Sequence, residues 1–92
     1  MKFYTIIDIW GTDEVQDCWI AHFDKKEDVE KCFFDHLHQH APELDDQDIA
    51  LGFADCLAGI GFQYEGQGEY GTLFVRNEEV QTSFDPKKMP WA

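Results

Sequence analysis

The first quarter of the chain is rich in β-branched and aromatic residues. Residues 2–10 (KFYTIIDIW) form one such run, and residues 11–14 (GTDE) have the composition of a turn. Residues 15–23 continue the apolar pattern. The pattern therefore predicts a β-hairpin that ends at Phe23.

Large apolar side chains are predicted on both faces of this hairpin. If Trp10 pairs with Val15, Ile6 lies opposite Trp19, and successive side chains alternate between faces. The two faces are then Tyr4, Ile6, Trp10, Trp19 and Phe23 on one side, and Phe3, Ile7, Ile9, Cys18 and Ile20 on the other. A sheet with one solvated face alternates apolar and polar residues. We therefore expect both faces to be shielded from solvent. The second face is covered by another layer of the domain, by a target protein, or by a second copy of the chain that binds the Tyr4/Trp10/Trp19 face.

The apolar spacing changes to a helical period after the hairpin. Asp24 and Glu27 match a capping box, and Pro42 removes Ala41 from helical geometry. The residues at helical spacing are Val29, Cys32, Phe33, His36, Leu37 and His40. This pattern predicts a helix over residues 25–40.

A second helix is predicted to follow the proline. Asp45 or Asp46 is its expected N-cap, and Gly59 or Gly61 its expected stop. Its apolar stripe is Ile49, Phe53, Cys56, Leu57 and Ile60. Gly52 inside this helix predicts the close approach of another backbone.

Strand character returns in the last third of the chain. Residues 62–65 and 70–76 are predicted strands joined by a glycine-rich turn at 66–68. Asn77-Glu78 is predicted as a tight turn, and residues 80–84 as a short final strand before an irregular tail at 85–92. The order ββ-αα-βββ predicts a single α+β domain over residues 1–92, an antiparallel sheet with a helical hairpin packed on one face.

The charge of the chain is strongly acidic. Of its 92 residues, 19 are Asp or Glu and 7 are Lys or Arg, giving a net charge of −12, while 43% are hydrophobic. The apolar content predicts a folded domain despite the charge. The charge argues against binding nucleic acid or an anionic membrane, because both need Lys and Arg. It favours a basic protein partner, or it serves solubility alone.

The basic residues are segregated. No Lys or Arg lies between Lys31 and Arg76, whereas acidic residues recur throughout this block. The candidate partner-binding residues are Glu43, Asp45, Asp46, Asp48, Asp55, Glu65 and Glu69. They form one negative surface only if the joint between the helices lies on the same side as the Glu65–Glu69 turn; otherwise they are helix caps and a solvated face.

Cys32, His36 and His40 are weak candidates for a metal site. Their spacing of four residues places them along one stripe of the first helix. No H-E-x-x-H or other complete ligand pattern is present, and histidines near a helix C-terminus also interact with its dipole. We therefore expect neither a bound metal nor a cofactor.

The cysteines and the N-terminus bear on localisation. Cys18, Cys32 and Cys56 form no C-x-x-C motif, and each falls in an apolar pattern, which predicts buried free thiols in a reducing compartment. Met1-Lys2-Phe3-Tyr4 lacks the apolar run of a signal peptide, and no segment reaches membrane-span length. These features predict a cytoplasmic protein.

The chain lacks a catalytic motif. Gly66-x-Gly68-x-x-Gly71 has the G-x-G-x-x-G form, but a predicted strand follows it and Glu65 and Glu69 flank it. A phosphate site needs a helix N-terminus at this place, so a hairpin turn is the better interpretation. We expect no enzymatic activity.

In charge, size and lack of a catalytic pattern, the chain is similar in type to inhibitors that phages and mobile elements use against nucleic-acid-binding defence machinery, such as anti-CRISPR DNA mimics. It is also similar in type to immunity proteins that block nucleases. This similarity implies an acidic binding protein that masks a basic, nucleic-acid-binding surface. The alternatives are a metal-binding domain using Cys32, His36 and His40, and a homodimeric accessory protein.

Overall fold

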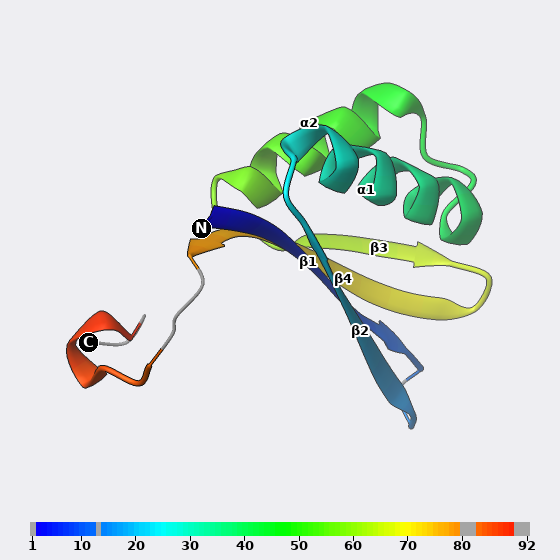
Figure 1. Ribbon diagram of the computed structural model, residues 1–92. Helices are drawn as coiled ribbons and strands as arrows, with labels where there is room; N and C mark the ends of the chain where they lie inside the picture. The colour runs from blue at the N-terminus through cyan, green and yellow to red at the C-terminus, as the bar shows by residue number, and fades with distance from the viewer. Residues whose placement is uncertain (1, 13, 80–82, 90–92) are drawn as a thin grey trace.

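Four antiparallel strands form one sheet with two helices on a single face (Figure 1). The computed structural model describes residues 2–12, 14–79 and 83–89. The elements are β1 (Lys2–Gly11), β2 (Gln16–Phe23), α1 (Lys26–His40), α2 (Asp46–Leu57), β3 (Phe62–Gly66), β4 (Glu69–Glu79) and the 3₁₀ helix η1 (Pro86–Lys88). The strand order is β2-β1-β4-β3. The predicted α+β class, an antiparallel sheet carrying a helical hairpin, is confirmed.

The register between β1 and β2 differs from the predicted one by two residues. Trp10 pairs with Asp17, and Ile6 with Ala21. The turn explains the shift, because the Thr12 amide donates to the Val15 carbonyl at 2.8 Å and so places Val15 opposite Thr12, not opposite Trp10. An even shift leaves each side chain on its predicted face.

Strand β4 is longer than predicted. It pairs with β1 from Gly11–Tyr70 to Lys2–Glu79, so the predicted turn at Asn77-Glu78 is wrong. The partner groups that β1 offers along its whole length satisfy this backbone and override the turn preference of Asn77. Residues 80–82 of the predicted final strand lie outside the described residues, and Phe84 lies in no strand.

Local signals set the ends of the helices. Lys25, not Asp24, is the N-cap of α1, and it makes no side-chain capping bond. Asp45 caps α2 by accepting from the Asp48 amide at 2.8 Å. Helix α1 ends at His40, directly before the non-helical Ala41 that Pro42 imposes.

The end of α2 is a Schellman motif around Gly59. Gly59 has φ +93°, its amide donates to the Cys56 carbonyl at 3.0 Å, and the Ile60 amide donates to the Asp55 carbonyl at 2.9 Å. The helix therefore stops at Leu57. Leu57 and Ile60, predicted in the buried stripe, are 40% and 59% exposed; Leu57 is the last residue of α2, and Ile60 lies beyond its end.

The core lies between the helices and the sheet. Its fully buried large side chains come from β1, α1, α2 and β4, and include Ile6, Val29, Phe33, Leu37, Ile49 and Leu73. Burying each such side chain contributes about 1.5–3 kcal/mol. At Gly52 the close neighbour is the ring of Phe62, so the glycine accommodates a side chain and not the predicted backbone.

The cysteines differ in exposure. All are free, with Cys56 buried, Cys32 half-buried and Cys18 exposed, so the prediction of three buried thiols is wrong at Cys18. Cys18 lies on the sheet face opposite the helices, since it pairs with Ile9. No helix within the described ranges is long and apolar enough to cross a membrane.

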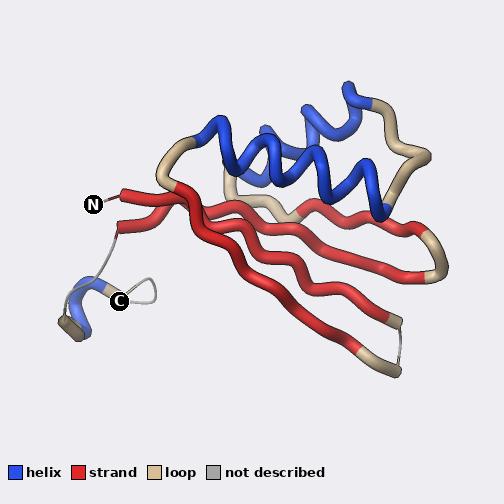
Figure 2. The backbone as a smooth tube through the Cα atoms, turned by 45° about the vertical axis from the view of Figure 1, so that its right-hand side comes forward, coloured by secondary structure: helices blue, strands red, loops and turns tan. Residues whose placement is uncertain are grey.

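The helices cover the face predicted as a homodimer interface. Of the three residues of the predicted Tyr4/Trp10/Trp19 face, Tyr4 and Trp19 are partly buried against the core beneath the helices. Figure 2 shows both helices on this side of the sheet. The opposite face carries Ile9 and Ile20, which are 41% and 54% exposed.

Candidate functional site

A buried polar network lies at the centre of the sheet. The Tyr64 hydroxyl donates to the Asp8 carboxylate at 2.8 Å (Oδ2) and 3.0 Å (Oδ1), and His36 Nε2 lies 2.8 Å from Asp8 Oδ2. Asp8 is 0% exposed, and His36 and Tyr64 are each 9% exposed. The network therefore joins β1, α1 and β3.

The sequence around these residues makes room for the network. Tyr64 pairs with Gly71 of β4, and a Cβ at Gly71 would overlap the Tyr64 ring and hydroxyl. The ring of Trp19 packs edge-on against His36, with centroids 5.1 Å apart. The glycine thus lets Tyr64 reach across β4 towards Asp8, while Trp19 helps to hold the imidazole in place.

The electrostatics of the network favour a structural role. Burial, the hydrogen bond to Asp8 and the charge of Asp8 raise the pKa of Tyr64, so its hydroxyl stays protonated and donates. Every buried side-chain polar atom among the described residues has a hydrogen-bond partner. A fully satisfied buried network ties elements together and specifies one arrangement of them.

The sequence prediction missed Asp8 and Tyr64 as members of a site. A charged residue between Ile7 and Ile9, inside an apolar strand, was the available signal. A buried carboxylate needs hydrogen-bonding partners. Nothing in the spacing along the chain identifies Tyr64 as one of them.

The candidate metal ligands do not form a site. His36 points Nε2 at Asp8 and Tyr64, and its ring lies 4.4 Å from that of His40. Cys32 is half-buried, and burial followed by the charge of Asp35 raises the pKa of its thiol, which disfavours the thiolate that a metal needs. Over residues 2–12, 14–79 and 83–89, no three His, Cys, Asp or Glu side chains gather as metal ligands.

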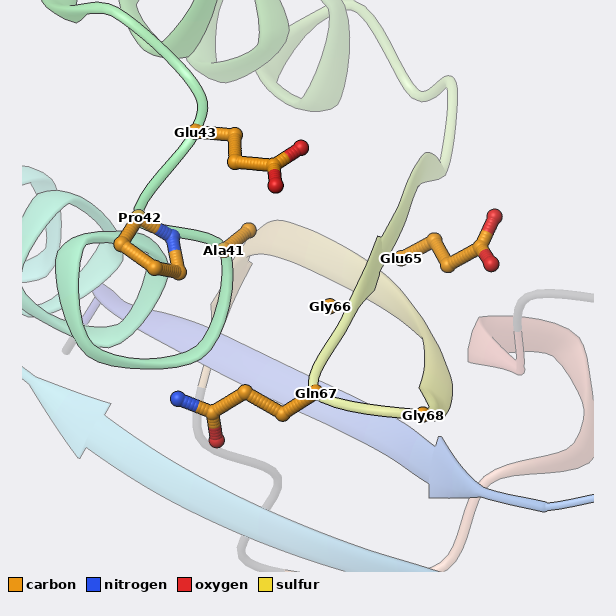
Figure 3. Close-up of a pocket in the computed structure, with 7 residues that line it drawn as sticks. All are labelled: Ala41, Pro42, Glu43, Glu65, Gly66, Gln67 and Gly68. Carbon is orange, nitrogen blue, oxygen red and sulfur yellow. The ribbon is translucent and has the colours of Figure 1, made fainter.

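Two of the candidate acidic residues meet at the joint between the helices. Glu43 and Glu65 line one hollow with Ala41, Pro42, Gly66, Gln67 and Gly68 (Figure 3). Both carboxylates extend towards the same side in this view. The joint and the β3–β4 turn therefore lie side by side, a point that the sequence left open.

Gly66 permits this close approach. A Cβ there would overlap the carbonyl oxygen of His40, so only glycine allows the turn to pack against the end of α1. Gln67 adds a hydrogen bond from Nε2 to the Gln39 carbonyl oxygen at 3.3 Å. These contacts hold Glu65 near Glu43.

The other candidate acids are distributed around this hollow. Asp45, Asp46 and Asp48 lie at the start of α2, where Asp45 is the N-cap and Asp46 Oδ1 lies 2.7 Å from His38 Nε2. Asp55 lies in the last turn of α2, about 10.5 Å along the axis from Asp48 at 1.5 Å per residue. Glu69 lines a separate hollow with Trp10, Val15 and Asp17.

Few of these carboxylates have a cationic partner. Within the described ranges, the only carboxylates within 4.0 Å of a basic side chain are Asp8, beside His36, and Asp46, beside His38, and neither contact includes Lys or Arg. The negative charge of Glu43, Asp48 and Glu65 is therefore not compensated by a neighbouring base.

Comparison of the chain with protein-family models, with curated proteins and with solved structures gives no match. The function of the chain is therefore inferred from the geometry of its acidic side chains.

Proposed function

We propose that this chain is a non-enzymatic binding protein whose acidic surface occupies a basic, nucleic-acid-binding site on another protein. The observation that supports this most directly is the meeting of Glu43 and Glu65 at one hollow. Their carboxylates come from segments separated in sequence by the whole of α2. We call the surface formed by Glu43, Asp46, Asp48 and Glu65 the acidic surface.

The acidic surface suits a cationic side chain. The hollow between Glu43 and Glu65 is lined by small residues, namely Ala41, Gly66 and Gly68, which leave space for the stem of an Arg or Lys. Asp46 and Asp48 extend the negative charge along the first turn of α2. A surface of this kind attracts a groove built for phosphates and speeds its association.

Inhibitors of nucleic-acid-binding defence complexes and immunity proteins of nucleases both act in this way, by covering the site that would bind nucleic acid. Either role fits an acidic surface without a catalytic group. In both, the chain competes with nucleic acid for the same basic residues. Binding then weakens with added salt, because exposed charges are screened within about 8 Å at physiological ionic strength.

The test begins with the immobilised protein and a lysate of its native host, eluted with rising salt. We expect a protein with a basic, nucleic-acid-binding site in the eluate. Its affinity for a labelled DNA or RNA duplex is then measured with and without this chain. Simultaneous binding of the duplex and the chain would refute the proposal.

The decisive variant combines Glu43→Lys with Asp48→Lys. Asp45 is left unchanged because it caps α2. The matched control combines Glu30→Lys with Glu79→Lys, which changes the net charge equally at exposed positions outside the block between Lys31 and Arg76. We expect the first variant to lose at least tenfold in affinity and the control to lose much less, with both folded by circular dichroism. Equal losses would show that net charge, and not this surface, drives binding.

A further inference from the structure

The sheet face opposite the helices carries a continuous apolar patch. Ile7 pairs with Ile20 of β2 and with Phe74 of β4, and so joins three strands on this face. Ile20 and Tyr70 are 54% and 56% exposed. Monomeric proteins rarely expose an apolar patch of more than a few hundred Å² without a use for it.

The charged residues of this face lie towards its two ends. Arg76 pairs with Thr5 of β1, at one end of the patch. Glu65 pairs with Tyr70, which in turn pairs with Gly11 at the other end. Thr5 and Gly11 are equally far from Asp8 along β1. A rotation by 180° about an axis that runs perpendicular to the strands at Asp8, parallel to the sheet, therefore brings the Arg76 end of one copy over the Glu65 end of the other.

We propose that a second copy of this chain covers the apolar patch, face to face, with the strands of the two copies antiparallel. The half-turn places Ile7 over Ile9 of the second copy. It places Arg76 over Tyr70 of the second copy and within reach of that copy's Glu65, on the neighbouring strand. A two-fold interface has to be complementary to itself, and this arrangement meets that condition in both shape and charge.

The shared area is that of a weak dimer. The half-turn overlaps the two copies over the positions from Thr5 to Gly11 on β2, β1 and β4, because β3 pairs only with Glu69 to Leu73 and so has no counterpart in the second copy. At about 3.4 Å per residue and about 4.8 Å between strands, these seven positions on three strands cover roughly 350 Å² per copy, or roughly 700 Å² for the two copies. This is the size of a weak, transient interface, so we expect association only towards high micromolar concentration.

Of the four residues of the acidic surface, only Glu65 lies at this interface, where it would face Arg76 of the second copy. Asp46 and Asp48 lie on α2, in the layer on the other side of the sheet, as Figure 2 shows for the helices. Glu78, which also belongs to the apolar face, accepts a hydrogen bond from the Thr5 hydroxyl at 3.4 Å and lies beyond Arg76, outside the overlap. The charges of Asp46 and Asp48 therefore point away from the second copy.

The first test is the mass in solution, measured by light scattering and sedimentation from about 1 to about 200 µM, the range in which an interface of this size associates. We expect twice the chain mass of 10.7 kDa at the upper end. Ile20→Lys should give a monomer, weakening association at least a hundredfold. Leu51→Lys, at a 61% exposed position on α2, should remain a dimer.

A wild-type monomer throughout this range would overturn the proposal, as would an Ile20→Lys dimer as tight as the wild type. Circular dichroism establishes that both variants are folded. Added salt should weaken this dimer only slightly, because most of its interface is apolar and only the contacts between Arg76 and Glu65 are screened. The salt response thus separates it from the proposed binding through the acidic surface, and either proposal can fail alone.

The second test concerns the orientation of the copies. Arg76→Glu should weaken the dimer about tenfold, because the carboxylate introduced at this position would face Glu65 of the second copy. Adding Glu65→Arg should restore the affinity to within about threefold of the wild type. A double variant no better than Arg76→Glu would overturn the antiparallel arrangement.

Discussion

The Tyr64 hydroxyl donates to both oxygens of the Asp8 carboxylate, at 2.8 and 3.0 Å, across 56 positions of sequence. The two residues lie on β3 and β1, which are not neighbours, because β4 lies between them in the sheet. The Tyr64 side chain reaches across Gly71 of β4 to make this contact. His36 of α1 completes the network and joins the sheet to the helices.

Removing the hydroxyl tests this relationship. Tyr64→Phe should lower the free energy of unfolding by about 1–3 kcal/mol, because Asp8 loses a donor while remaining buried. Tyr70→Phe removes a hydroxyl from an exposed ring and should change the free energy by less than about 0.5 kcal/mol. Urea unfolding followed by circular dichroism measures both, and equal losses would contradict a structural role for the network.

The role of Gly71 is tested in the same assay. Gly71→Ala should destabilise the fold by about 1–3 kcal/mol, because its Cβ displaces the Tyr64 ring. The loss should be smaller in a Tyr64→Phe background, where displacing the ring no longer breaks the bond to Asp8. A double-mutant cycle measures this coupling, and strict additivity would show that Gly71 acts independently of Tyr64.

The capping role of Asp45 has a matched comparison one residue away. Asp45→Ala should lower the free energy of unfolding by about 1 kcal/mol, since the Asp48 amide loses its acceptor. Asp46→Ala removes only an exposed contact to His38 and should cost less than about 0.5 kcal/mol. Thermal or urea unfolding decides between them, and the reverse order would place the cap at Asp46.

Alkaline pH should destabilise the fold through Cys56. Burial raises the pKa of its thiol from 9.0 to about 11, despite an opposing hydrogen bond from the Phe62 backbone. A raised pKa in the folded state favours the protonated form, so this stabilisation is complete below pH 9 and is lost between pH 9 and 11. The slope from one thiol is at most about 1.4 kcal/mol per pH unit.

Cys56→Ala provides the control for this pH effect. The variant loses packing at every pH, so the comparison is between slopes and not between absolute stabilities. We expect a shallower loss of stability above pH 9 in the variant, measured by urea unfolding at fixed pH values. The raised pKa of Tyr64 acts in the same direction and remains in both proteins. Identical slopes would show that Cys56 titrates alike in the folded and unfolded states.

Signals carried by a few neighbouring residues predicted the helices well. Pro42 ended α1 within one residue of the prediction, and an aspartate at Asp45 or Asp46 was expected to cap α2. Gly59 was one of two expected stops, and its positive φ explains why it is the one used. Such signals are predictable because steric limits and hydrogen bonds between near neighbours act before any long-range contact forms.

The strand pairings needed the tertiary structure. Asn77-Glu78 favours a turn in isolation, but β1 offers backbone partners there and the strand continues. The hairpin register moved by two residues because the Thr12–Val15 hydrogen bond sets the length of the turn. At Asn77-Glu78 the backbone partners that β1 supplies outweigh a local preference, whereas in the hairpin the geometry of the turn decides the register.

The sequence by itself determined the order of the elements from β1 to β4, the ends of the helices to within a few residues, and an acidic block without Lys or Arg between Lys31 and Arg76. The tertiary structure alone decided which sheet face the helices cover, that Asp8 meets Tyr64, and that Glu43 meets Glu65. The physical reason is the sequence separation of the interacting groups. Helix caps and helix-breaking residues act on adjacent backbone groups, whereas these contacts form only when distant segments pack together in the folded chain.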